Sequence, residues 1–281
     1  MSTEYRYRIL NVFAREGRLT GNPLCVFEDA RGIDDATMQA LARQFNLSET
    51  TFILPSEKAT ARVRIFTPSY EMAFAGHPTL GTAHVVRSLK GGDAIALEMK
   101  AGIIPVNARG NRWTLQGVAP KARAFELHRR DLEAILSLEP GDVGEYPLWV
   151  STGREQLVVP LTSVEAVRRA RPGADGFARL KSADGQSMAY VFHDAGDRAG
   201  TVECRFFFPN GPAILEDPAT GSACANLGGW YTVVRPGADV VRIVSQGEQV
   251  GRPSTLYLDV THGAIRVGGE VIELGRGALT L

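Results

Sequence analysis

The chain has 281 residues, of which 44% are hydrophobic and 22% are charged, and its formal net charge is zero. This is the composition of a soluble globular protein; the absence of a basic block argues against nucleic acid as a partner, and no stretch approaches the roughly 18 apolar residues that a membrane span needs. The three cysteines form no C-x-x-C motif, and the first residues lack the apolar run of a signal peptide, so we expect a cytoplasmic protein.

The first half of the chain is predicted to alternate strands and helices. Residues 34–45 are predicted to form a helix because Met38, Leu41 and Phe45 recur at the spacing i, i+3 and i+7. Asp34 favours the start of this helix. The other predicted elements of this half are strands over 5–13 and 24–27 that pair as a hairpin, strands over 51–54 and 61–66, a helix from about 78 to 89, and short strands within 94–118.

The second half is predicted to repeat this plan after a crossover at 120–123. Many antiparallel strands around one long helix in each half indicate an α+β fold with two pseudo-symmetric lobes, each a sheet wrapped around a central helix. The expected lobes cover residues 1–119 and 120–269. The predicted elements of the second half are helices over 129–138, 164–170 and 218–233, and strands over 148–151, 156–161, 188–192, 202–208, 240–244, 255–260 and 264–267.

A short motif occurs twice in the chain. The sequence H-P-T-L-G-T-A begins at His77, and D-P-A-T-G-S-A begins at Asp217, so both contain P-x-x-G-[ST]-A. The motifs lie 140 residues apart (217 − 77), and each follows an Arg-x-Phe segment, Arg64 and Arg205 being the arginines. A duplicated half is the simplest explanation. In this alignment the two copies place His77 and Asp217, which are different proton-active groups, at equivalent positions.

Both motifs have the residues of a helix start. Asp217 is a favourable N-cap and Pro218 suits the first helical position, and His77-Pro78 repeats the pattern. The unpaired N–H groups and the positive end of a helix dipole attract anions. Two such helix starts meeting between the lobes would hold a carboxylate or a developing enolate without a metal. Alone, Asp217 is better explained as a simple cap and His77 as a turn residue. The repeat favours a functional role for both.

The remaining candidate groups are less distinctive. Glu49, between a predicted helix and strand, is either a surface charge or a proton carrier whose pKa is raised by desolvation. Ser222 is either a small packing residue or a hydroxyl donor. Cys25 and Cys204 are expected in the core, whereas Cys224 could sense the helix dipole, which would lower its pKa. The aligned residue in the other copy is His84, so chemistry with two facing thiols is disfavoured, and no metal-binding or nucleotide-binding signature is present.

Taken together, these segments resemble the phenazine-biosynthesis PhzF family, whose fold is that of diaminopimelate epimerase. The matching segments occur in order over nearly the whole chain. They are G-N-P-L (21–24), N-L-S-E-T (46–50), R-I-F-T-P (64–68), F-A-G-H-P-T-L-G-T-A (74–83), S-T-G (151–153), E-D-P-A-T-G-S-A (216–223) and Q-G-E-Q-V-G-R-P-S (246–254).

The resemblance implies an enzyme that isomerises a dihydro-hydroxyanthranilate by moving a proton along the ring, without cofactor or metal. It also implies a homodimer, and a last strand, over about 270–281, that completes the first lobe. The family's glycines bind the substrate carboxylate through backbone N–H groups. By position in the matching motifs, the implied catalytic residues are Glu49, His77 and Asp217, and the implied substrate-binding residues are Gly76, Gly221 and Ser222.

Three functions therefore compete. The first is a cofactor-independent isomerase acting on a small carboxylated substrate, with no nucleic-acid or membrane partner. The alternatives are a non-thiol racemase or epimerase of a small amino or hydroxy acid, and a non-catalytic binder of small acids. The intact set of Glu49, His77 and Asp217 argues against the binder. We also expect the halves to be related by a pseudo-two-fold axis, with His77 and Asp217 facing one cleft.

Overall fold

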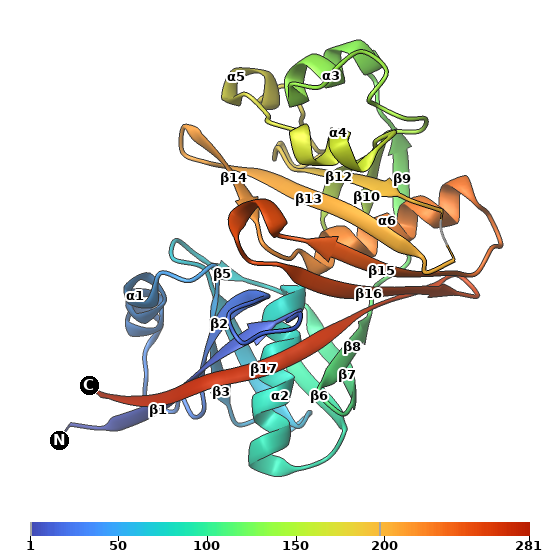
Figure 1. Cartoon of the computed structure of the whole chain (residues 1–281). Coiled ribbons are helices and arrows are strands. Elements are labelled where there is room, and N and C mark those ends of the chain that lie inside the picture. The colour runs from blue at the N-terminus through green and yellow to red at the C-terminus, as the bar shows by residue number, and fades with distance from the viewer. Residues whose placement is uncertain (1, 197) are drawn as a thin grey trace. The chain divides into compact units, whose positions relative to one another are not determined.

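The computed structural model describes residues 2–196 and 198–281. The chain divides into two compact units, unit 1 (Met1–Leu115 and Gly268–Leu281) and unit 2 (Gln116–Val267). Figure 1 shows one long helix, α2 or α6, lying among the strands of each unit. None of the helices in the described residues is both long enough and apolar enough to cross a membrane.

Unit 1 is a ring of strands around a buried helix. Its elements are β1 (Glu4–Val12), β2 (Asn22–Phe27), α1 (Asp35–Phe45), β3 (Thr50–Leu54), β4 (Ala61–Phe66), β5 (Glu71–Met72), α2 (Gly76–Lys90), β6 (Ala94–Met99), β7 (Gly102–Arg109), β8 (Arg112–Gln116) and most of β17 (Ala264–Thr280). The strands pair in the order β1, β2, β3, β4, β6, β7, β8, β17 and back to β1, so the sheet closes. Helix α2 packs inside this ring, and a closed ring leaves few unpaired strand edges.

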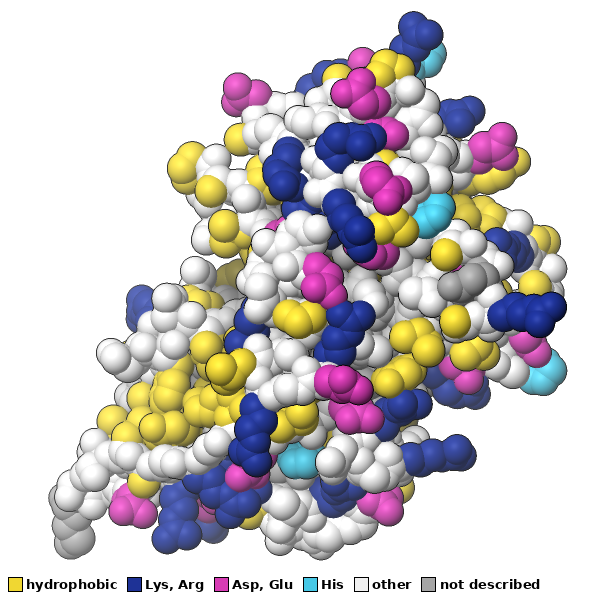
Figure 2. Space-filling model, viewed as in Figure 1, with side chains coloured by type: hydrophobic (Ala, Val, Ile, Leu, Met, Phe, Trp, Pro, Cys, Tyr) yellow, Lys and Arg dark blue, Asp and Glu magenta, His cyan; other side chains and the backbone are white. Residues whose placement is uncertain are grey.

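A second apolar layer covers the outside of this ring. Helix α1 begins after Asp34, whose side chain accepts a hydrogen bond from the Thr37 backbone N–H at 2.7 Å, as the sequence predicts for an N-cap. Its buried face, which includes Met38 and Leu41, packs with strand residues in a cluster that also takes in Phe27 and Phe52. Figure 2 shows hydrophobic side chains gathered on unit 1 near the two termini.

Unit 2 also wraps a sheet around one helix. Its elements are β9 (Lys121–Ala124), α3 (Arg129–Leu136), β10 (Leu148–Ser151), β11 (Glu155–Pro160), α4 (Val164–Arg169), α5 (Ala174–Phe177), β12 (Ala189–Asp194), β13 (Thr201–Asn210), β14 (Ala213–Asp217), α6 (Gly221–Val234), β15 (Val240–Gln246), a 3-10 turn (Glu248–Val250), β16 (Ser254–Thr261) and the start of β17. Helix α6 contacts β9, β10, β11, β15 and β16. It is buried on all sides because Ala, Gly and Leu fill its middle turns.

The expected crossover at 120–123 is wrong, because residues 121–123 belong to β9. Lys121 pairs with Ser151, so β9 is antiparallel to β10. The segment has no β-branched residue, and one long side chain holds it in place. The Arg123 guanidinium lies 4.8 Å from the ring centroid of Trp149 and donates to Glu155 at 3.0 Å. This cross-strand pairing, rather than intrinsic β propensity, stabilises the strand.

Both units place an Arg–Glu pair on the hairpin that leads to the long helix. In unit 1, Arg64 on β4 donates to Glu71 on β5 at 2.8 Å, and its guanidinium lies 5.0 Å from the Phe66 ring. In unit 2, Arg205 on β13 donates to Glu216 on β14 at 2.6 Å. Both carboxylates are mostly buried, with 12% and 8% of the side chain exposed. Each Arg–Glu pair therefore holds in place the strand that precedes the long helix, β5 in unit 1 and β14 in unit 2.

The Glu71 carboxyl gives a test of this pairing by pH. Hydrogen bonds from Arg64, followed by one from Lys100, hold the pKa of Glu71 below its ordinary value despite its burial. A lowered folded-state pKa stabilises the protein above the unfolded value of about 4.3, and this contribution is lost as pH falls through the folded value. We expect Glu71→Gln to lower the free energy of unfolding by about 1–3 kcal/mol at pH 7, and the difference from wild type to shrink below about pH 4. Urea unfolding at several pH values measures this difference, and Glu57→Gln, at an exposed position, is the control. A difference that does not change with pH would contradict the assignment.

Candidate functional site

In unit 1, the structure brings Glu49 and His77 together. His77 is the second residue of α2 and only 6% exposed. Glu49 lies in the loop between α1 and β3, immediately before Thr50. The His77 Nε2 and Glu49 Oε2 atoms are 3.4 Å apart, and 7% and 15% of the two side chains are exposed. The sequence predicted both residues, and their proximity places two groups that can exchange protons at the start of the buried helix.

The loop that carries Glu49 is anchored on both sides. Before it, the Ser48 hydroxyl donates to the Asn22 side-chain oxygen at 3.3 Å, and Asn22 is buried at the start of β2. After it, the hydroxyl groups of Thr51 and Thr82 lie 2.8 Å apart, joining β3 to the middle of α2. These bonds hold the Glu49 backbone against the helix that carries His77. A carboxylate and an imidazole fixed in this way are suited to general acid–base chemistry.

In unit 2, the helix start differs from the one that the sequence predicts. Helix α6 begins at Gly221 with Thr220 as its N-cap residue, so the expectation that Asp217 caps the helix and Pro218 opens it is wrong. Asp217 is instead the last residue of β14. The Thr220 hydroxyl donates to the Asp217 Oδ2 atom rather than capping the helix. The Asp217 carboxylate is thus held by the turn in front of the helix.

The start of α2 requires the same correction. This helix begins at Gly76 after Ala75, so His77-Pro78 lies inside its first turn. The glutamates Glu71 and Glu216 each lie five residues before the first helical glycine (76 − 71 and 221 − 216). Counted from the helix starts, His77 therefore corresponds to Ser222. The expectation that His77 and Asp217 occupy equivalent places is wrong.

Ser222 is held by a buried network of uncharged groups. The Gln156 side-chain amide donates to the Ser222 Oγ atom at 3.1 Å. Asn226 donates to Gln156 Oε1 at 2.8 Å and accepts from the Thr152 backbone N–H at 2.7 Å. Gln156 and Asn226 are 1% and 0% exposed. At the helix start of unit 2, Ser222 thus contacts a neutral amide on β11. At the helix start of unit 1, His77 contacts the Glu49 carboxylate from the loop before β3.

The cysteines are core residues. Cys25, Cys204 and Cys224 are all buried, which confirms the expectation for the first two. The expectation for Cys224 is wrong: burial raises the pKa of this thiol instead of the helix dipole lowering it. Its side chain points into the core from the fourth residue of α6, and the cost of moving a thiolate out of water outweighs the dipole.

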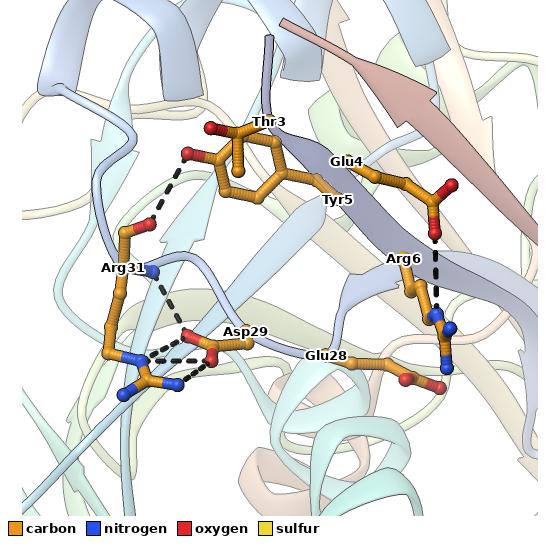
Figure 3. A pocket seen from close by; sticks show the side chains of 7 residues that line it. All are labelled: Thr3, Glu4, Tyr5, Arg6, Glu28, Asp29 and Arg31. Atoms are coloured by element: carbon orange, nitrogen blue, oxygen red, sulfur yellow. Dashed lines mark hydrogen bonds and ion pairs between the residues drawn. The ribbon is translucent and has the colours of Figure 1, made fainter. Parts of the chain in front are cut away.

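A cavity in unit 1 contains none of the predicted site residues. Its volume is about 540 Å³, and it is lined by Thr3, Glu4, Tyr5, Arg6, Glu28, Asp29 and Arg31. Figure 3 shows two ion pairs there, Arg31 with Asp29 at 2.5 Å and Arg6 with Glu4 at 3.5 Å. The remaining charged group, Glu28, pairs with Arg8 outside the lining at 2.5 Å. Within the described residues, no group of three or more His, Cys, Asp or Glu side chains is arranged to hold a metal ion.

Comparison with known proteins gives matches over nearly the whole chain. An uncharacterized isomerase of Pasteurella multocida is 36% identical over 286 residues, which cover 99% of this chain and 95% of that protein. The trans-2,3-dihydro-3-hydroxyanthranilate isomerase of Pseudomonas aeruginosa is 33% identical over 282 residues, which cover 98% and 96%. A crystal structure of a PhzF-family phenazine biosynthesis protein from Bacillus anthracis matches with a TM-score of 0.86 at 24% identity, covering 99% of both chains.

These similarities confirm two predictions from the sequence. The structural match confirms the α+β fold with a sheet around a central helix in each lobe. The named relatives confirm that the chain resembles isomerases. The family model described as "Phenazine biosynthesis-like protein" matches residues 10–276. With this match and relatives above 30% identity over almost its full length, the chain belongs to the phenazine biosynthesis-like (PhzC-PhzF) protein family.

Proposed function

We propose that this protein is a cofactor-independent isomerase that shifts a proton on a small carboxylated substrate, with a dihydro-hydroxyanthranilate as the first candidate. The Glu49–His77 pair carries the proposal, because it is a mostly buried carboxylate beside an imidazole at 3.4 Å. The relatives named for this reaction support the choice of substrate. In the shift, one C–H bond breaks, its electron pair moves through the conjugated system, and a C–H bond forms at another carbon. No oxidant or reductant is needed.

The proposed roles follow from the chemistry of each group. Glu49 removes the proton from the substrate and returns it at the second carbon. His77 takes part in this proton relay or orients the Glu49 carboxylate. Asp217 orients the substrate by accepting hydrogen bonds from it. The first residues of α2 and α6 have backbone N–H groups without intrahelical partners, which suit a carboxylate. The proposed catalytic residues are Glu49, His77 and Asp217, and the proposed substrate-binding residues are Gly76, Gly221 and Ser222.

The uncharged pair in unit 2 favours an isomerase over a racemase. A racemase that uses two bases needs a proton-active group at both helix starts. Counted from the helix starts, Ser222 takes the place of His77, and neither Ser222 nor the Gln156 amide that donates to it titrates in the ordinary pH range. The acidic group of unit 2, Asp217, lies before the helix, where its carboxylate accepts a hydrogen bond from Thr220. One carboxylate that both takes and gives the proton suits a shift between two carbons of one molecule. We further propose that the enzyme is a cytoplasmic homodimer with no nucleic-acid or membrane partner.

Isotope transfer separates these functions. We expect the purified protein to convert trans-2,3-dihydro-3-hydroxyanthranilate in D2O, with the product keeping part of the original hydrogen because the shielded carboxylate returns it. Mass spectrometry and proton NMR measure the label. A racemase would instead introduce deuterium at the α-carbon of the recovered substrate in a panel of amino and hydroxy acids. Failure to convert the probe, together with such exchange, would overturn the proposal, and binding without either reaction would indicate a small-acid binder.

A further inference from the structure

We propose that Gln246 is a positioning residue that sets the orientation of the Asp217 carboxylate through Thr220. Gln246 is the last residue of β15 and is 1% exposed. Gln246 is not one of the proposed catalytic or substrate-binding residues. The inference rests on the proposed function, in which Asp217 acts on the substrate.

The side-chain amide of Gln246 makes three hydrogen bonds to one turn. Its Nε2 donates to the Asp217 carbonyl oxygen at 2.8 Å and to the Thr220 Oγ1 atom at 3.0 Å, and its Oε1 accepts from the Thr220 backbone N–H at 3.3 Å. A backbone carbonyl needs a donor and a backbone N–H needs an acceptor. The two backbone partners therefore fix which end of the amide is nitrogen and which is oxygen.

This orientation determines the direction of the next hydrogen bond. The Thr220 hydroxyl has a single hydrogen, and the amide nitrogen of Gln246 only donates. The hydroxyl oxygen accepts from Gln246, so its hydrogen remains for the Asp217 Oδ2 atom, to which it donates. Gln246 thus holds both the backbone of Asp217 and, through Thr220, one oxygen of its carboxylate.

Close contacts surround Gln246 on both sides. Gly247 adopts φ +85°, and a Cβ there would lie 2.5 Å from the Pro218 carbonyl oxygen and 2.3 Å from that of Arg252. The backbone after Gln246 is therefore in direct contact with the same turn. On the other side lies Cys204, 1% exposed, whose Sγ is 3.7 Å from Gln246 Oε1 and donates to the Ser245 carbonyl oxygen at 3.2 Å.

A double-mutant cycle tests this coupling with trans-2,3-dihydro-3-hydroxyanthranilate as the probe. Gln246→Met keeps the length of the side chain but removes its donors and acceptor. We expect it to lower kcat/KM by about 10- to 100-fold when Asp217 is present, and by less than about threefold in the Asp217→Asn background, since the effects of residues that share one hydrogen-bond network are not additive. Equal losses in the two backgrounds would show that Gln246 acts independently of Asp217, and would overturn the proposal.

Gln246→Glu gives a second test in a side chain of the same shape. An ionised carboxylate accepts the hydrogens of the Thr220 hydroxyl and N–H, so the hydroxyl turns away from Asp217. We expect the activity of this variant relative to wild type to recover as pH falls, because the protonated acid regains one donor. A purely structural defect would not give this pH profile. Gln39→Met is the control, since the half-buried Gln39 also donates to a loop carbonyl, that of Thr67 at 2.8 Å, but belongs to unit 1 and, within the described residues, makes no hydrogen bond to the turn that holds Asp217.

A measurement without substrate keeps this test separate from the proposed function. In a crystal structure of the Gln246→Met or Gln246→Glu variant, we expect the Thr220–Asp217 side-chain hydrogen bond to be lost or the carboxylate to be rotated. If wild type does not convert the probe but the carboxylate moves in the variants, the proposed function fails for this substrate and the positioning role holds. An unchanged Asp217 carboxylate in both variants would overturn the positioning role whatever the activity.

Discussion

Glu49→Gln is expected to lower kcat by about 10²- to 10⁴-fold, the usual range for the loss of a general acid–base group. The variant keeps the shape and the hydrogen-bonding reach of the side chain but removes the group that titrates. KM is expected to change much less, because the helix-start N–H groups proposed to bind the carboxylate are untouched. Steady-state kinetics with trans-2,3-dihydro-3-hydroxyanthranilate, and single-turnover measurements of the proton shift, give the two effects separately.

Cys224→Ala is the matched control for this prediction. The thiol is fully buried near the start of α6, and burial raises its pKa, so it is unsuited to act as a base. The variant should therefore keep nearly full turnover. If Glu49→Gln kept its activity and Cys224→Ala lost it, the Cys224 thiol and not the Glu49 carboxylate would be the catalytic base. Loss in both, with folding unchanged, would show that the helix start of unit 2 carries more of the reaction than we propose.

The sequence predicted most helices and strands because their patterns are local. The apolar spacing of Met38 and Leu41 defines α1 whatever surrounds it, and the structure buries both. The residue pattern predicted a strand over 264–267, and only the family resemblance implied a further strand over about 270–281, whereas the structure has one continuous strand, β17, from Ala264 to Thr280. Glycines in its second half conceal it, since glycine ordinarily argues against a strand. Gly277 lies opposite Tyr7 in the antiparallel pairing of β1 with β17, and a Cβ there would lie 2.5 Å from the end of the Tyr7 ring, so glycine leaves room for this ring.

The candidate site was predicted in part, and its register was not. The shared motif P-x-x-G-[ST]-A aligns His77 with Asp217. The helices, however, start at Gly76 and Gly221, and the position of each start depends on the length of the hairpin before it. The hairpin before α6 is longer: 11 residues separate Arg205 from Glu216, against 7 between Arg64 and Glu71. Sequence identity therefore aligns the wrong turn. That His77 and Asp217 face one cleft stays a prediction.

The buried side-chain amides near Ser222 and Asp217 were not predicted, for a different reason. Gln156 and Gln246 lie in strands whose other residues are largely apolar, and Asn226 lies within a helix rich in Ala and Gly. An isolated amide in such a segment has no spacing that marks it as functional. Their importance lies in partners distant in sequence, such as the 66 residues between Gln156 and Ser222. A buried polar side chain in an apolar strand is the one signal that could have drawn attention to them, because burial of an unpaired amide is costly.

Arg205→Met is expected to have the second large effect, a loss of about 3–5 kcal/mol in the free energy of unfolding. Only 6% of the Arg205 side chain and 8% of the Glu216 side chain are exposed. Besides Glu216, Arg205 Nη1 donates to the backbone carbonyl oxygens of Val167, Arg168 and Ala170 at 3.2, 3.1 and 2.6 Å. The variant leaves a buried carboxylate without its cation and three carbonyl groups without this donor. Urea unfolding monitored by circular dichroism measures the loss.

The double variant Arg205→Met/Glu216→Gln distinguishes an uncompensated charge from lost packing. If the cost arises from the buried carboxylate, removing that charge restores part of the stability, because a missing ion pair is tolerated better than half of one. If the double variant is as unstable as Arg205→Met, the three carbonyl groups and the Phe207 ring, 4.7 Å from the guanidinium, carry the effect. Arg168→Met is the surface control, since its pair with Glu203 leaves 55% of the arginine exposed and is expected to contribute little. A small loss in Arg205→Met would mean that β14, and with it the turn that holds Asp217, is fixed by other contacts.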